Sequence, residues 1–143
     1  MKKIIVTGHG QFATGLQSAV ELLAGKNEDL IIVDFVGSGG KDGALKAAYE
    51  KVLNEHPDHE FLFFCDLLGG TPYKTAATLA FENERLAVVA GCNIGALVDM
   101  LFIKESYTLP ELARQCITAS HSATGLFEIR EPSNQEEIDE DGI

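Results

Sequence analysis

Two kinds of apolar pattern alternate along the chain. Short runs rich in β-branched and aromatic residues predict strands over 2–6, 30–35, 61–65 and 86–90. Apolar residues spaced three or four apart predict helices after these runs, over 12–23, 45–53, 71–81 and 94–101. This regular alternation of strand and helix predicts an α/β fold.

The predicted strands are continuously apolar, which is typical of strands covered on both faces. Because helical crossovers favour parallel connections, we expect a doubly wound, mainly parallel sheet in the order 2-1-3-4 with helices on both faces. Thr108 and Glu111 have the spacing of a capping box and predict one more helix. Residues 125–130 alternate charged and apolar side chains from Phe127 on, which predicts a last, antiparallel strand at an edge or between subunits.

Size and composition favour one globular domain. The chain has 143 residues, of which 45% are hydrophobic, enough for a single core. It has no apolar run of membrane-spanning length, and its first run breaks at Thr7-Gly8, too early for a signal peptide. Three cysteines without a C-x-x-C pair suit a reducing compartment, so we expect a cytoplasmic protein without disulfides.

The charge is strongly acidic, with 11 Lys and Arg against 22 Asp and Glu and a formal net charge of −11. We expect a domain over 1–130 and an acidic, disordered tail over 131–143, where acids occur without any base. An acidic surface without a basic stripe repels phosphate backbones. Nucleic acid and anionic membranes are therefore not expected as partners.

Two loops at the carboxyl ends of the predicted strands carry the candidate chemistry. His9 follows the first strand between two glycines, and Asp66 follows the third strand. These strands are neighbours in the order 2-1-3-4, so the imidazole and the carboxylate should lie side by side. A carboxylate that accepts one ring N–H fixes the tautomer and leaves the other nitrogen with a free lone pair. His9 is therefore the candidate nucleophile and Asp66 its orienting acid.

Backbone N–H groups near His9 complete the candidate site. Thr71-Pro72 resembles a helix N-cap followed by proline at the first helical position. Unpaired N–H groups at helix starts and in glycine turns attract anionic oxygens. The pattern outlines a phosphohistidine site, and its expected phosphoryl-binding residues are Gly10, Gly69, Gly70 and Thr71.

A nucleotide-sensing module that binds NAD is the alternative from another class. Residues Gly8 to Ala13 satisfy G-x-G-x-x-A, and Asp34 ends the second strand where a ribose-binding acid would lie. That hypothesis gives Asp66 and the glycine turn no role. A third hypothesis is a plain interaction domain with a coincidental histidine. Metal-ligand spacing and the P-loop pattern are absent from the sequence, so no metal or cofactor is expected.

Four segments together resemble the IIA domain of the mannose-family phosphoenolpyruvate-dependent sugar phosphotransferase system (PTS). They are residues 4–10, residues 34–36, the turn Asp66-x-x-Gly69-Gly70-Thr71-Pro72, and Gly91-x-Asn93-Ile94. The resemblance runs from Met1 to about Arg130. It implies a cytoplasmic phosphotransferase that accepts a phosphoryl group from the phosphocarrier HPr and passes it to a IIB component during sugar uptake.

The resemblance also implies roles for single residues. His9 matches the phosphorylated histidine of the family, with Nε2 as the acceptor atom. Asp66 matches the acid that orients the ring through Nδ1, and Thr71 matches a small hydroxyl residue near the phosphoryl group. A homodimer that exchanges a C-terminal strand is implied, with residues 125–130 at the matching place. The IIB component is expected as a separate polypeptide, and no direct membrane insertion is expected. A dihydroxyacetone kinase-type phosphotransfer subunit is the alternative within the same chemistry.

Overall fold

The computed structural model describes residues 1–37 and 43–129. The elements alternate as the sequence predicts: β1 (Lys2–His9), α1 (Phe12–Ala24), β2 (Leu30–Phe35), α2 (Ala44–Glu55), β3 (Glu60–Cys65), α3 (Thr71–Ala80), β4 (Leu86–Ala90), α4 (Ile94–Ile103), the 3₁₀ helix η1 (Lys104–Ser106) and α5 (Leu109–Ser122). Within these ranges, no helix is both long and apolar enough to cross a membrane.

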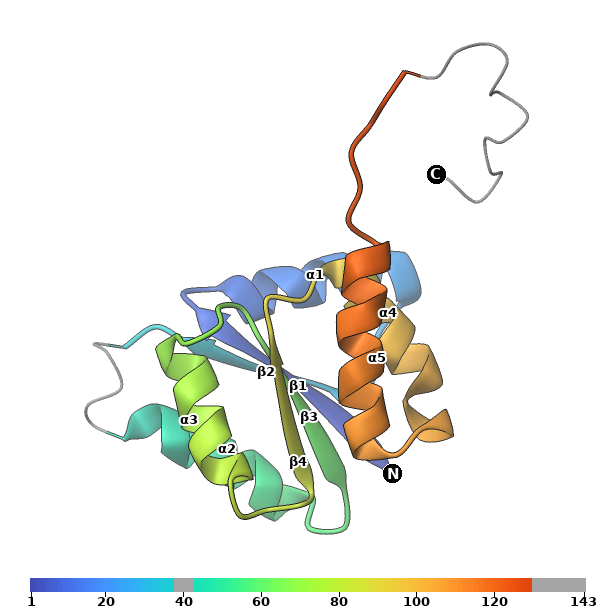
Figure 1. The fold of residues 1–143 in the computed structure, drawn as a ribbon. Helices are drawn as coiled ribbons and strands as arrows, with labels where there is room; N and C mark the ends of the chain where they lie inside the picture. Colours follow the sequence, from blue (N-terminus) through green and yellow to red (C-terminus); the bar gives the residue numbers. More distant parts are fainter. Residues whose placement is uncertain (38–42, 130–143) are drawn as a thin grey trace.

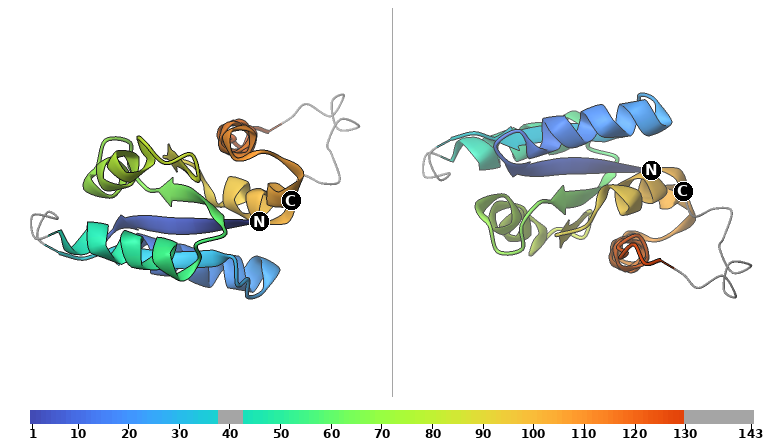
Figure 2. Two further views of the ribbon diagram at one scale, coloured as in Figure 1. Left: turned by 90° about the horizontal axis from the view of Figure 1, so that it is seen from below. Right: turned by 90° about the horizontal axis from the view of Figure 1, so that it is seen from above.

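The four strands form one parallel sheet in the order β2-β1-β3-β4. Helices α2 and α3 pack on one face of the sheet, and α1, α4 and α5 pack on the other (Figure 1). Figure 2 shows the sheet between helices from two further directions. The predicted doubly wound α/β fold and strand order are confirmed.

The two central strands, β1 and β3, form the middle of the core. Alternate side chains of each strand enter the two hydrophobic clusters on opposite faces of the sheet. Burying each such side chain stabilises the fold by about 1.5–3 kcal/mol. The strands that end at His9 and just before Asp66 are therefore the most firmly held. Their fully buried residues include Ile4, Ile5, Val6, Leu62, Phe63 and Phe64.

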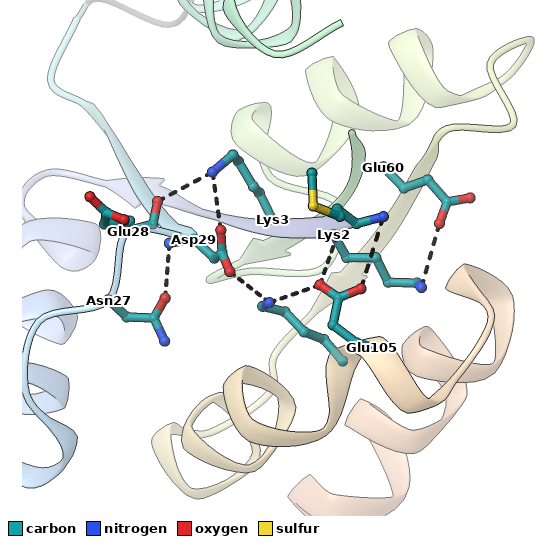
Figure 3. A network of polar contacts seen from close by, with 9 residues as sticks. Lys2, Lys3, Asn27, Glu28, Asp29, Glu60 and Glu105 are labelled. Atoms are coloured by element: carbon teal, nitrogen blue, oxygen red, sulfur yellow. Dashed lines mark hydrogen bonds and ion pairs between the residues drawn. The ribbon is translucent and has the colours of Figure 1, made fainter. Parts of the chain in front are cut away.

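A network of charged side chains lies at the opposite end of the sheet, where the strands begin (Figure 3). Lys104 Nζ is 2.7 Å from Asp29 Oδ2 and 3.0 Å from Glu105 Oε2, and Lys3 Nζ is 3.0 Å from Asp29 Oδ1. Burial lowers the pKa of Lys104, but the hydrogen bonds to Asp29 and Glu105 outweigh it and hold that pKa above its ordinary value. Each of these charges has a partner of opposite sign, so the network is not a candidate site. Its ion pairs join β1, the residue before β2, and η1.

Residues 125–129 differ from the sequence prediction. They contain no regular secondary structure and pair with no strand of the described sheet, and they extend away from α5 (Figure 1). A strand requires a neighbouring extended segment to satisfy its backbone groups, and among residues 1–37 and 43–129 none pairs with them. Pairing with a second subunit stays a prediction. Arg130 and the predicted acidic tail lie outside the described residues.

Candidate functional site

His9 and Asp66 meet at the carboxyl ends of the two central strands. Thr7 is opposite Cys65 in the β1–β3 register, so the residues that follow share one edge of the sheet. His9 Nδ1 lies 2.9 Å from Asp66 Oδ2, and the backbone N–H of His9 donates to the same oxygen at 2.9 Å. Because a carboxylate oxygen accepts, Nδ1 is the donor, and Nε2 of the neutral ring therefore keeps its lone pair. The predicted juxtaposition is present.

Strand β1 is longer than the apolar run that predicted it. Thr7, Gly8 and His9 continue the ladder by pairing with residues 33–35 of β2. His9 is thus the last residue of a strand rather than part of a loop. Its backbone is therefore held by the sheet as well as by Asp66.

The electrostatics of the pair favour an ionised Asp66. Partial burial acts to raise the pKa of this carboxyl, but the hydrogen bonds from the backbone and the ring of His9 hold it below its ordinary value. The Asp66 side chain is 16% exposed, whereas that of His9 is 45% exposed. The result is a fixed negative charge behind a ring that solvent and partners can reach.

Two neighbours fix the plane of the His9 ring. Phe35 contacts it edge-on, with ring centroids 5.7 Å apart and an interplanar angle of 71°. On Gly70, a Cβ atom would lie 2.8 Å from His9 Cε1. The sequence pattern alone gives Phe35 no role. Its position at the end of β2, next to β1 in the expected strand order, is the signal that places it near His9.

Under the hypothesis that His9 accepts a phosphoryl group, Gly70→Ala should slow that reaction. The backbone of Gly70 is extended (φ −75°, ψ 170°), a conformation that alanine adopts, so the added methyl group would clash chiefly with the His9 ring, at 2.8 Å, and press on Leu67 O, at 3.3 Å. We expect the rate of phosphate incorporation to fall by about tenfold, since small displacements of reacting groups cost this much or more. Gly15→Ala is the matched control, because a Cβ there meets open space. Wild-type kinetics for Gly70→Ala would contradict the expectation that the contact of Gly70 with the His9 ring sets the position of His9 Nε2.

Two of the backbone N–H groups that the sequence analysis expects to bind phosphoryl oxygens already have partners within the chain. The N–H of Gly10 donates to Phe35 O at 2.7 Å, and that of Gly70 donates to Leu67 O at 3.0 Å. In this conformation both N–H groups already have a carbonyl partner, with which a phosphoryl oxygen would have to compete. Gly10 and Gly69 have φ of +57° and +84°, so both form tight turns that other residues adopt only with strain. The assignment of Gly10, Gly69 and Gly70 as phosphoryl-binding residues stays a prediction.

Thr71 is the first residue of α3, and Gly70 is the N-cap. The predicted assignment of Thr71 as N-cap is therefore wrong by one residue, because the extended conformation ends at Gly70. No side-chain cap is present at this helix start, and first-turn N–H groups have no acceptor within a helix. Among the groups expected to bind phosphoryl oxygens, the N–H groups at the start of α3, including that of Thr71, are thus best suited to hold anionic oxygens.

The Asp34 carboxylate accepts hydrogen bonds from Thr14 of the same chain and is therefore not available to bind a ribose. The Thr14 N–H donates to Asp34 Oδ1 at 3.0 Å, and the Thr14 hydroxyl donates to Oδ2. Both oxygens of the acid that would bind ribose in a dinucleotide site are therefore engaged with α1. This arrangement gives the nucleotide-sensing hypothesis no support.

The third loop at this end of the sheet, after β4, is structural. Asn93 caps α4 by accepting from the Ala96 N–H at 3.0 Å, and its side-chain amide donates to Ser120 O at 2.9 Å and Thr124 Oγ1 at 3.1 Å. On Gly95, a Cβ atom would lie 2.9 Å from Ala123 Cβ. These contacts fix where α5 ends. Across 1–37 and 43–129, no group of three or more His, Cys, Asp or Glu side chains has an arrangement that could hold a metal ion.

Comparisons with known proteins agree with this geometry. Residues 3–117 match the EIIA-man family, described as "PTS system fructose IIA component". The fructose-specific EIIA component of Bacillus subtilis (strain 168) is 34% identical over 113 residues, which are 78% of this chain and 77% of that protein. The mannose-specific EIIAB component of Escherichia coli (strain K12) is 28% identical over 102 residues, which are 71% of this chain and 32% of that protein.

Solved structures show the same fold. A mannose/sorbose-specific IIA subunit from Enterococcus faecalis superposes with a TM-score of 0.81 at 27% identity, over 92% of this chain and 98% of that one. An EIIA component from Streptococcus agalactiae gives a TM-score of 0.76 at 30% identity, over 88% and 97% of the two chains.

Proposed function

Because this chain belongs to the EIIA-man family of PTS IIA components, we propose that it accepts a phosphoryl group from the phosphohistidine of HPr and passes it to a IIB component. The acceptor is Nε2 of His9. The single observation that carries the proposal is the 2.9 Å contact between His9 Nδ1 and Asp66 Oδ2, which places the proton of the neutral ring on Nδ1 and leaves the Nε2 lone pair free on an exposed ring.

The transfer is a displacement at phosphorus. The lone pair of His9 Nε2 forms a new P–N bond as the P–N bond of the donor breaks, and the departing electron pair returns to the donor imidazole. The His9 ring gains positive charge, which the Asp66 carboxylate stabilises through the Nδ1 proton. The N–H groups at the start of α3 are suited to hold the equatorial oxygens. Transfer to the IIB component reverses these steps, so the chain is regenerated.

The donor chemistry requires no cofactor, because a phosphohistidine is already an activated phosphoramidate. The proposed reaction takes place in the cytoplasm. The three cysteines carry free thiols, which is consistent with a reducing compartment.

Phosphate incorporation tests the proposal directly. The chain is incubated with phosphoenolpyruvate, enzyme I and HPr, and any added phosphate is located by mass spectrometry. One acid-labile phosphate on His9 is expected, and its transfer to a IIB component should follow when that protein is added. No incorporation, or phosphate on another residue, would contradict the proposal.

The proposal includes a homodimer in which the segment from Gly125 of one subunit pairs with β4 of the other. β4 is an edge strand of the described sheet. Beside it lies a groove of about 440 Å³ between α3 and α5, with an apolar lining that includes Tyr73, Val88 and Ile117. Residues 125–129 supply matching apolar side chains that are 82–90% exposed in this chain: Leu126, Phe127 and Ile129.

Placing charges on this segment should separate the dimer. Phe127→Asp combined with Ile129→Asp puts two carboxylates on one face of the segment, so apolar burial against a second subunit would be lost. We expect light scattering to show a dimer for the wild type and a monomer for the double variant at micromolar concentration. Phe102→Asp is the matched control, because Phe102 is 75% exposed on α4. A dimer that persists in the double variant, or a wild-type monomer, would contradict the exchange.

A further inference from the structure

A buried pair of hydroxyl groups lies beneath His9. Tyr49 of α2 and Thr7 of β1 are both fully buried, and their hydroxyl oxygens are 2.7 Å apart. Thr7 and His9 are two residues apart on β1, so their side chains leave the same face of the sheet. The Tyr49 hydroxyl also lies 3.3 Å from the carbonyl oxygen of Pro72, in the first turn of α3. One phenol oxygen thus connects α2, β1 and α3.

The direction of both hydrogen bonds follows from the chemistry of the partners. A carbonyl oxygen only accepts, so Tyr49 donates its hydroxyl proton to Pro72, and the Thr7 hydroxyl donates to the Tyr49 oxygen. Burial raises the pKa of Tyr49 above its ordinary value despite the hydrogen bond from Thr7. The phenol therefore stays protonated and keeps its donor role at every pH at which the protein would work.

Packing alone does not account for the Tyr49 hydroxyl. The ring fills the core against Phe63, with centroids 4.9 Å apart and an interplanar angle of 62°. A phenylalanine would provide the same ring, and a buried hydroxyl costs stability unless it is hydrogen-bonded. What the hydroxyl adds is a direct connection between the strand that carries His9 and the helix that begins at Thr71.

The separation of β1 and α3 matters for phosphoryl transfer. His9 ends β1, and the first-turn N–H groups of α3 belong to the helix that Gly70 places against the His9 ring. Asp66, which directly follows β3, orients the ring, but its side chain makes no hydrogen bond to α3 that would connect the ring to this helix. We infer that Tyr49 is a positioning residue, whose hydroxyl sets the distance between Nε2 of His9 and the start of α3. This inference rests on the proposed function of His9.

Removing the hydroxyl tests the inference. Tyr49→Phe keeps the ring and removes both hydrogen bonds, Thr7→Val removes one of them, and Thr7→Ser retains a hydroxyl. We expect the single-turnover rate from phosphorylated HPr to fall about tenfold in Tyr49→Phe, less in Thr7→Val, and to stay near the wild-type rate in Thr7→Ser. The KM for HPr should not change, because Tyr49 and Thr7 are buried and the docking surface is unaltered.

A control variant separates positioning from stability. Thr108→Ala removes the side-chain cap of α5, which lowers stability without touching the site. It should transfer phosphate at the wild-type rate. A second measurement needs no phosphate: the NMR resonances of the His9 ring Cε1–H and of the Gly70 and Thr71 amides should shift in Tyr49→Phe and not in Thr108→Ala.

The outcomes distinguish the inference from the proposed function. A wild-type rate with unshifted resonances in Tyr49→Phe would overturn the inference, as would equal slowing in Thr108→Ala at the same loss of stability. If the wild-type chain takes up no phosphate, the proposed function fails. The NMR resonances would then still decide whether Tyr49 positions His9 against α3.

Discussion

His9→Ala should abolish the incorporation of acid-labile phosphate from phosphoenolpyruvate, enzyme I and HPr. The reason is that Nε2 of His9 is the proposed acceptor, and alanine leaves no nucleophile beside Asp66. The loss should be complete within the detection limit of mass spectrometry, and the circular dichroism spectrum should not change, because the His9 side chain is 45% exposed.

His121→Ala is the matched control for this experiment. His121 is an exposed histidine in the last turn of α5, so its replacement should leave phosphate incorporation at the wild-type level. Full labelling of His9→Ala would refute the assignment of His9. Loss of labelling in His121→Ala would move the acceptor to α5.

Asp66→Asn should slow the single-turnover transfer by about a hundredfold or more. The carboxylate accepts both the ring and the backbone N–H of His9 through one oxygen. An amide can place its NH₂ group toward Nδ1, which favours the tautomer with the proton on Nε2, and it cannot neutralise the charge that develops on the ring. Loss of an orienting acid beside a catalytic histidine costs up to about four orders of magnitude in rate in other enzymes. Asp99→Asn, an exposed change on α4, is the control.

The wild type and Asp66→Asn also allow a test of how stability depends on pH. The pKa of Asp66 is held below its ordinary value of 3.8, so its ionised form stabilises the folded state above that pH. This contribution is lost as the pH falls through the lowered pKa of the folded state. In urea unfolding, the free-energy advantage of the wild type over Asp66→Asn should therefore shrink as the pH falls below 3.8. An advantage that does not shrink in this acid range, or an unchanged transfer rate at pH 7, would contradict the role of Asp66.

Much of the fold was predictable because its signals are local. Residues 61–65 form a continuous apolar run, and a strand covered on both faces is the structure that buries all of it. Thr108 and Glu111 form the predicted capping box, a motif contained in four consecutive residues. The contact of His9 with Asp66 was also predictable, because strand order and the edge where parallel strands end follow from general rules of α/β topology.

The sequence by itself thus determined the α/β class, the strand order and the contact between His9 and Asp66. Only the tertiary structure decided which N–H groups near His9 are already bonded, as those of Gly10 and Gly70 are. It also decided that Phe35 contacts the His9 ring and that the Tyr49 hydroxyl bonds the first turn of α3. The physical reason is range: an apolar run or a capping motif is read from neighbouring residues, whereas the partner of one N–H or one hydroxyl depends on dihedral angles and on packing between segments far apart in the chain.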